Sequence, residues 1–128
     1  MVKNVLVVDD EIGTLLAYKK LLQSPEVEIH TAATLQEATD YLGKNPYDVV
    51  ISDLRLGGSI GFEGFEVMRF AKAQNPNTAI ILITAYGNAE IKRRAALLGA
   101  TLYFEKPILA ADLRKAIATL GAHHEYSV

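Results

Sequence analysis

Five residues of this sequence have side chains that could act together in one reaction, and each ends or directly follows a short apolar segment: Asp9, Asp10, Asp53, Thr84 and Lys106. Carboxylates held in one crevice repel one another, and a hard cation with oxygen ligands is the simplest means of keeping them ionised. Magnesium is the expected ion. An ammonium group and a hydroxyl on the opposite side would complete a pocket for the oxygens of a phosphoryl group. The residue types therefore predict phosphoryl transfer with an aspartate as the nucleophile.

Each of these residues also has an ordinary structural explanation. Asp9 and Asp10 could cap a following helix, because carboxylates favour helix N-termini, and Asp53 could be a turn residue. Thr84 suits a strand, and Lys106 could be a solvated surface charge. None of these explanations predicts that all five residues lie at strand ends of one sheet, so their convergence favours the functional interpretation.

The segments that position these residues alternate between Val- and Ile-rich runs and runs of helical period, which is typical of a parallel sheet covered on both faces. The expected strands are residues 4–8, 27–31, 49–52, 79–84 and 101–105, and the expected helices are residues 12–23, 34–43, 65–74, 88–98 and 109–120. Five β–α pairs with right-handed crossovers predict a doubly wound α/β fold of the flavodoxin-like type, a five-stranded parallel sheet in the order 2-1-3-4-5. Ligands of such sheets gather at the carboxyl ends of the strands.

Local signals support the predicted helices. The run Thr34-Leu35-Gln36-Glu37 is a capping box, and Gly99 is a natural left-handed residue at the end of the fourth helix. Lys92, Arg93 and Arg94 should lie on the outer face of that helix. Two helices carry an apolar side, formed by Ile12, Leu15, Leu16 and Leu22 in the first and by Leu109, Leu113, Ala116, Ile117 and Leu120 in the fifth.

Composition limits the classes of function. With 128 residues, the chain is long enough for one domain and too short for two of ordinary size. No apolar run approaches the roughly 20 residues of a membrane-spanning helix, so no membrane contact is expected. The chain has no cysteine, which excludes disulfides and thiolate metal sites and agrees with a cytoplasmic location. A formal charge of −2 gives no global attraction to nucleic acid, and we expect no direct nucleic-acid binding by this domain.

From about Lys3 to Leu120, the chain resembles the receiver family of two-component response regulators. The features that match are the acidic pair, the central aspartate, and the dipeptides Thr84-Ala85 and Lys106-Pro107. The resemblance implies a receiver domain over residues 1–122, followed by a short polar tail at residues 123–128.

The resemblance also implies how a metal ion would be held. Asp53 would be the phosphoacceptor and a metal ligand, and Asp10 would be a direct ligand of Mg²⁺. Asp9 would bind the ion through water or orient the other ligands. Arg55 would contribute its backbone carbonyl.

Three further residues gain roles from the same resemblance. Thr84 would bond the phosphoryl group, and Lys106 would neutralise its charge. Tyr103 would turn inward when Thr84 moves toward the phosphate. Family members commonly hold the bond between Lys106 and Pro107 in the cis form, which costs little at proline.

The implied partner is a histidine kinase or phosphotransfer protein, or a small phosphodonor in its place. Phosphorylation would alter the surface formed by helix 4, strand 5 and helix 5, and an output domain or a second copy of the chain would bind there. The domain would not be an enzyme in the usual sense, because it would catalyse only its own phosphorylation and dephosphorylation.

Two other classes share part of this pattern. An aspartyl-phosphate hydrolase places its nucleophile after the first strand in an Asp-x-Asp pattern, whereas Val8-Asp9-Asp10-Glu11 lacks that spacing and the chain leaves no room for a cap domain. A flavodoxin-like cofactor binder needs a Ser-, Thr- or Gly-rich phosphate loop after the first strand. The acidic residues here would repel a cofactor phosphate.

The loop after the phosphoacceptor departs from the family pattern. Gly57 follows Leu56 where proline is usual, and the triplet Gly61-Phe62-Glu63 recurs at once as Gly64-Phe65-Glu66. The family match resumes from Gly64, because alignment on Gly61 would place Gly64 inside the helix at a cost of about 1 kcal/mol. The extra triplet and the glycines between Gly57 and Gly64 are therefore expected to tune the lifetime of a phosphorylated state without building the site.

Overall fold

The computed structural model describes residues 2–56 and 61–120. Its elements, in order, are β1 (Lys3–Val8), α1 (Ile12–Leu22), β2 (Val27–Ala32), α2 (Leu35–Lys44), β3 (Val49–Asp53), α3 (Glu63–Gln74), β4 (Ala79–Thr84), α4 (Ala89–Leu97), β5 (Leu102–Glu105) and α5 (Ala110–Thr119). All neighbouring strands are parallel, and their order is β2-β1-β3-β4-β5. The expected fold class and strand order are confirmed. The predicted tail at residues 123–128, together with Gly57 and Gly58, lies outside the described residues.

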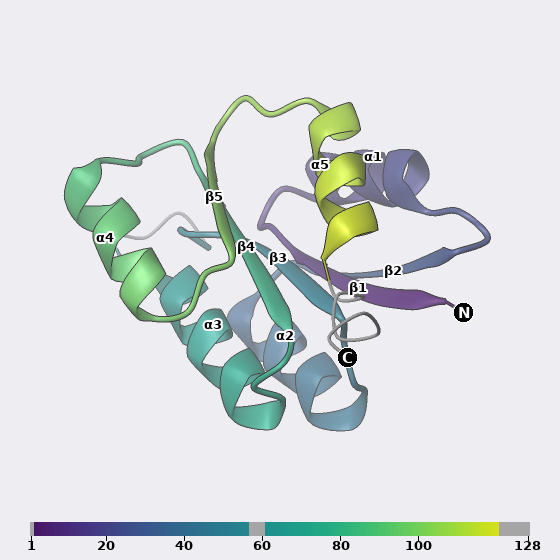
Figure 1. The fold of residues 1–128 in the computed structure, drawn as a ribbon, viewed down its shortest axis with the longest axis horizontal. Coiled ribbons are helices and arrows are strands. Elements are labelled where there is room, and N and C mark those ends of the chain that lie inside the picture. The colour runs from purple at the N-terminus through teal and green to yellow at the C-terminus, as the bar shows by residue number, and fades with distance from the viewer. Residues whose placement is uncertain (1, 57–60, 121–128) are drawn as a thin grey trace.

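Helices cover both faces of the sheet, with α1 and α5 on one side and α2, α3 and α4 on the other (Figure 1). Each side has its own apolar core. The α1 and α5 side contains Leu15, Leu22, Leu113 and Ile117, and the other side contains Ala38, Leu42, Met68 and Ile91. The middle strands are apolar at nearly every position because both of their faces are buried.

Strand register brings the candidate residues to one edge of the sheet. Val8 of β1 pairs with Ser52 of β3, so Asp9 and Asp53 each come one position later on neighbouring strands. Thr84 pairs with Glu105, which places Lys106 just beyond the same edge. The carboxyl ends of β1, β3, β4 and β5 therefore form one site.

The signals predicted at the start of α2 and at the end of α4 are present in the structure, with one change in detail in the cap of α2. The hydroxyl of Thr34 accepts a hydrogen bond from the backbone N–H of Glu37 at 3.0 Å. The Glu37 carboxylate in turn accepts from the N–H of Ala33 at 2.7 Å, whereas a standard capping box uses the N–H of the capping residue itself. Gly99 ends α4 with a φ of +101°, the left-handed conformation that the sequence predicted.

Three apolar residues that the sequence assigned to the buried sides of helices are exposed instead. Ile12 and Leu16 on α1 are 64% and 66% exposed, whereas Leu15 and Leu22 lie in the core. Leu109 is 71% exposed and precedes α5 in an extended conformation, so the helical period does not apply to it. Within the part of the chain that the structure describes, no helix is both long and apolar enough to cross a membrane.

Helix α3 begins at Glu63, two residues earlier than predicted, and Gly64 lies in its first turn. The backbone N–H of Gly64 donates to the carbonyl of Leu54 at 2.8 Å. A Cβ at this position would lie 2.7 Å from the Leu54 Cα and would also collide with the Asp53 carbonyl. A glycine inside the helix is thus required, because α3 packs directly against the backbone that follows the phosphoacceptor candidate.

Replacing Gly64 with alanine should lower the free energy of unfolding by about 1–3 kcal/mol, the typical cost of overpacking. The matched control is Gly43→Ala in α2, where a Cβ would meet no atom within 4 Å. That change should stabilise the protein by ~0.5–1 kcal/mol, because alanine is the better helix former. Urea unfolding of both variants measures the difference. A Gly64→Ala variant as stable as Gly43→Ala would contradict the close contact.

Candidate functional site

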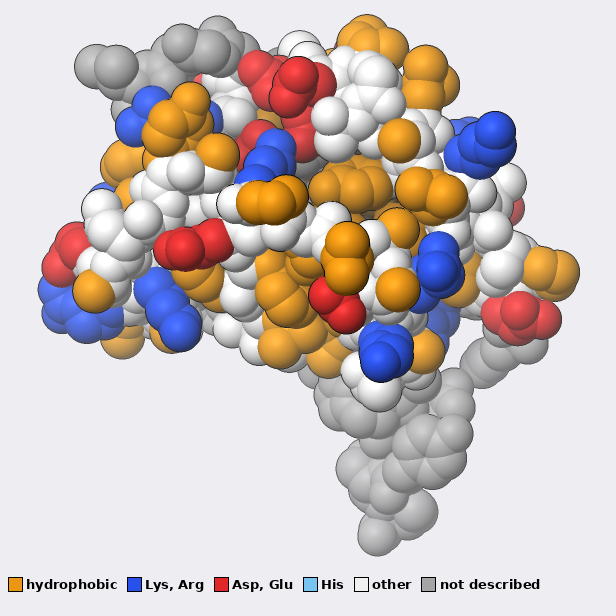
Figure 2. Space-filling model, turned by 90° about the horizontal axis from the view of Figure 1, so that it is seen from above, with side chains coloured by type: hydrophobic (Ala, Val, Ile, Leu, Met, Phe, Trp, Pro, Cys, Tyr) orange, Lys and Arg blue, Asp and Glu red, His pale blue; other side chains and the backbone are white. Residues whose placement is uncertain are grey.

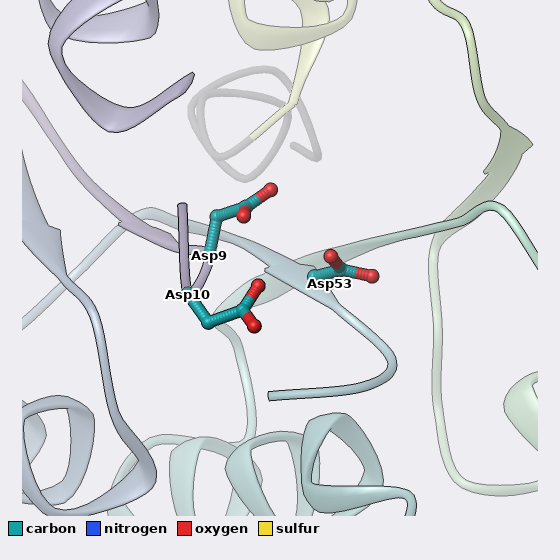
Figure 3. A group of neighbouring side chains, drawn as sticks. All are labelled: Asp9, Asp10 and Asp53. Carbon is teal, nitrogen blue, oxygen red and sulfur yellow. The ribbon is translucent and has the colours of Figure 1, made fainter. Parts of the chain in front are cut away.

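Three carboxylates converge where β1 and β3 end. Asp9 and Asp10 directly follow β1, and Asp53 is the last residue of β3. One oxygen from each side chain lies within 4.8 Å of the others (Figure 3). The sequence predicted this cluster, and the structure brings its members together.

Lys106 joins two of the three carboxylates. Its Nζ atom lies 3.0 Å from Oδ2 of Asp53 and 3.1 Å from Oδ2 of Asp9. The pKa of Lys106 is raised, because these bonds and charges outweigh the opposing effect of its partial burial. Burial raises the pKa of Asp53 above its usual range, although Lys106 opposes that shift. The ammonium group therefore compensates only part of the negative charge that the fold concentrates here.

Asp9 is almost completely buried, and its second carboxylate oxygen accepts the backbone N–H of Glu11 at 2.9 Å. Glu11 occupies the N-cap position of α1, and its own side chain forms no capping hydrogen bond. The bond from Glu11 shows that Asp9 orders the start of α1, but it uses only one of the two Asp9 carboxylate oxygens and does not involve Asp10. Within the described residues, the carboxylate of Asp10 has no ion pair.

A hollow of about 280 Å³ lies at the cluster and is bordered by Asp10, Glu11, Asp53, Arg55, Ala85, Tyr86 and Lys106. Carboxylate oxygens this close together are the ligands that Mg²⁺ or Ca²⁺ prefers. The ammonium group of Lys106 is bound to two of the three carboxylates. The residues present thus fit a divalent metal ion. A bound ion would supply the positive charge that Lys106 alone does not provide.

Thr84 ends β4 at the predicted edge, but its hydroxyl does not line this hollow. The side chain is buried, and Oγ1 accepts the backbone N–H of Tyr86 at 3.0 Å. Thr84 therefore orders the start of the β4–α4 connection in this structure.

Tyr103 on β5 is partly buried and, like Thr84, is not among the residues that border the hollow. Its hydroxyl donates to the Glu105 carboxylate at 3.4 Å and occupies the space where a side chain at position 87 would be. Gly87 leaves that space open. Burial and then the charge of Glu105 raise the pKa of Tyr103.

Sequence reasoning assigned only the backbone carbonyl of Arg55 to the site and missed its side chain. The Arg55 guanidinium carbon lies 4.2 Å from the centre of the Tyr86 ring, and both residues line the hollow. An arginine and a tyrosine more than 30 positions apart give no signal of this contact in a single sequence. The bond between Lys106 and Pro107 is cis, as expected.

Comparison with known proteins places this site in a family. The model of the response regulator receiver domain matches residues 5–118, which include every candidate residue. The chain belongs to the response-regulator receiver family. Receiver domains are regulatory modules of two-component systems, so the chain is assigned neither to the aspartyl-phosphate hydrolases nor to the flavodoxin-like cofactor binders.

Receiver relatives cover nearly the whole chain. Over 117 residues, the chain is 27% identical to sporulation initiation phosphotransferase F of Bacillus subtilis, covering 91% of this chain and 92% of that protein. It is also 27% identical to the response regulator protein PilR of Pseudomonas aeruginosa, but it spans only 26% of the length of PilR. The crystal structure of a CheY-like receiver domain protein from Methanospirillum hungatei covers 100% of both chains with a TM-score of 0.89 and 26% identity.

Proposed function

We propose that this receiver domain is a switch in which Asp53 accepts a phosphoryl group from a histidine kinase, a phosphotransfer protein or a small phosphodonor. The observation that carries the proposal is the ammonium group of Lys106 lying 3.0 Å from Asp53 within the acidic cluster. A nucleophilic carboxylate, a fixed cation and further carboxylates for a metal ion are the groups that phosphoryl transfer requires.

In the proposed reaction, a carboxylate oxygen of Asp53 attacks the phosphorus atom of the donor. The bond from phosphorus to the leaving group breaks, and the leaving group departs with the bonding electrons. Lys106, already beside Asp53, exchanges its ion pair for a charge-assisted hydrogen bond to a phosphoryl oxygen. Hydrolysis of the resulting acyl phosphate restores the carboxylate, so the domain acts only on itself.

Asp10, Asp53 and the backbone carbonyl of Arg55 are the proposed direct ligands of Mg²⁺, and Asp9 orients the cluster or binds through water. A bound Mg²⁺ would neutralise charge on the carboxylates and on the phosphoryl oxygens. The paired and buried carboxylate of Asp9 suits a supporting role, whereas Asp10 has no ion pair within the described residues and lines the hollow.

For the switch, we propose that Thr84 exchanges its bond to the N–H of Tyr86 for one to the phosphoryl group. Tyr103 would then leave Glu105 and turn inward, which alters the surface of α4, β5 and α5. The proposal requires the phosphorylated site to favour one of two conformations, because a ligand shifts an equilibrium only through different affinity for the two states. An output domain or a second copy of the chain would bind that surface.

Exposed apolar side chains that lie close in sequence to residues of the hollow support a protein phosphodonor. Ile12 and Leu16 on α1 and Leu109 before α5 are all more than 60% exposed. Hydrophobic side chains also gather over the middle of the face in Figure 2, the side on which the β5–α5 connection lies in Figure 1. A face of this kind suits the docking of a kinase or phosphotransfer protein, since larger exposed apolar patches usually mark interaction sites.

Incubation with acetyl phosphate tests the proposed reaction without knowledge of the cognate kinase. In the presence of Mg²⁺, intact-mass measurement should show the addition of one phosphoryl group per chain. With EDTA in place of Mg²⁺, the addition should fall to background, because the carboxylate cluster then repels the incoming phosphoryl oxygens. Absence of the mass increase with Mg²⁺, or steady turnover of an external phosphoester, would contradict the proposal.

A further inference from the structure

Two arginines and three aromatic rings form a continuous stack from the hollow to α4. The guanidinium carbon of Arg55 lies 4.2 Å from the ring centre of Tyr86 and 5.8 Å from that of Phe62. The guanidinium carbon of Arg94 lies 5.9 Å from the ring centre of Phe62 and 4.8 Å from that of Phe65. The stack therefore connects the β3–α3 loop, the β4–α4 loop, α3 and α4.

Ring contacts hold Arg55, the arginine that lines the hollow, in place. The Nε atom of Arg55 is buried and has no hydrogen-bond partner within the described residues. A guanidinium group is attracted to the negative face of an aromatic ring and is more weakly hydrated than an ammonium group. Because Nε makes no hydrogen bond to the described residues, the rings of Tyr86 and Phe62 supply the contacts that hold the guanidinium group of Arg55.

Phe62 belongs to the first copy of the repeated Gly-Phe-Glu triplet, and the two phenylalanines of the repeat have different environments. Phe65, from the second copy, is only 2% exposed and lies in the core. Phe62 is partly buried at the N-cap of α3, and its ring meets Phe65 edge to face at 5.9 Å. The repeat therefore supplies two rings with different roles. Phe65 is a core residue, and Phe62 contacts both arginines.

We propose that Phe62 is a positioning residue that holds Arg55 against Tyr86 and links this pair to Arg94 on α4. The inference rests on the proposed phosphorylation of Asp53. Arg55 and Tyr86 form part of the wall of the hollow, so their order controls how readily water reaches the acyl phosphate. Because Arg94 shares the Phe62 ring, the position of α4 and the stability of the phosphoryl group are coupled.

The first test uses the unphosphorylated protein and does not depend on the proposed function. NMR of the arginine Nε–Hε groups should show ring-current shifts for Arg55 and Arg94 in the wild-type protein. Phe62→Leu, which keeps an apolar contact with Phe65 but removes the ring, should move both resonances toward ordinary arginine positions. Phe62→Tyr keeps the ring and should leave both nearly unchanged. Unchanged arginine resonances in Phe62→Leu would overturn the positioning role.

The second test measures loss of phosphate from the wild-type protein, Phe62→Leu, Phe62→Tyr and Arg94→Met at one Mg²⁺ concentration. Phe62→Leu should shorten the half-life of the phosphoprotein about two- to fivefold, the population change expected when two long, partly exposed cation–π contacts are lost. Arg94→Met should also shorten the half-life of the phosphoprotein, although Arg94 does not line the hollow. Phe62→Tyr should restore the wild-type half-life, which a purely structural defect in Phe62→Leu would not predict.

The two tests separate failure of this inference from failure of the proposed function. Equal half-lives for wild type and Phe62→Leu would reject the effect of Phe62 on the site while leaving phosphorylation of Asp53 in place. A wild-type protein that takes up no phosphoryl group would reject the proposed function, and the arginine resonances would still decide whether Phe62 holds the stack. Thermal unfolding of each variant confirms that the measured proteins are folded.

Discussion

Replacing Asp53 with asparagine should reduce phosphoryl uptake from acetyl phosphate to background, while the wild-type protein gains one phosphoryl group per chain. The change removes the nucleophilic oxygen but retains the size of the side chain at the end of β3. The asparagine carbonyl oxygen can still accept a hydrogen bond from Lys106, which now lies 3.0 Å from Asp53. The fold should therefore survive, and the loss should reflect the chemistry of a single group.

Asp40→Asn is the matched control for this experiment. Asp40 is exposed on α2, accepts a hydrogen bond from Gln36 at 2.9 Å and lies outside the acidic cluster. Its replacement should leave phosphoryl uptake unchanged. The chain contains no cysteine, so thiol acylation by the donor cannot contribute to the measured mass. Equal mass gains in Asp53→Asn and wild type would show that another residue is the phosphoacceptor.

The sheet and the convergence of the site could be predicted because both follow from short-range patterns. Apolar runs such as residues 49–51 and 79–83 are buried on both faces, and a parallel sheet is the structure that buries such runs. Parallel strands bring their carboxyl ends to one edge, so a polar residue at each end must meet the others. The cluster of Asp9, Asp10 and Asp53 could therefore be predicted without knowledge of side-chain conformation.

Features that depend on side-chain direction could not be predicted. Ile12 and Leu16 are apolar like core residues, and sequence alone does not show that they are exposed while Leu15 of the same helix is buried. The Thr84 hydroxyl could reach the hollow or the N–H of Tyr86, and only the structure shows the second arrangement. The early start of α3 was missed because close packing of Gly64 on Leu54 overrides helix propensity.

Asp10→Ala should weaken Mg²⁺ binding by about 10-fold or more, since the site offers few protein oxygens and each carboxylate supplies much of the affinity. In the absence of metal, the same variant should be more stable than wild type to heat, because the remaining carboxylates repel one another less. Mg²⁺ should raise the Tm of the wild-type protein, since a ligand that binds only the folded state stabilises it. That increase should be much smaller in the variant at the same Mg²⁺ concentration.

Glu11→Ala provides the control that separates ligation from charge. Glu11 borders the same hollow and carries the same charge as Asp10, but it is not part of the carboxylate cluster. Its backbone N–H, which donates to Asp9, remains after the substitution. If Asp10 binds the metal directly, Glu11→Ala should keep most of the Mg²⁺ affinity, which titration of the three proteins at one ionic strength measures. Equal losses in the two variants would mean that negative charge near the hollow, and not ligation by Asp10, accounts for the affinity.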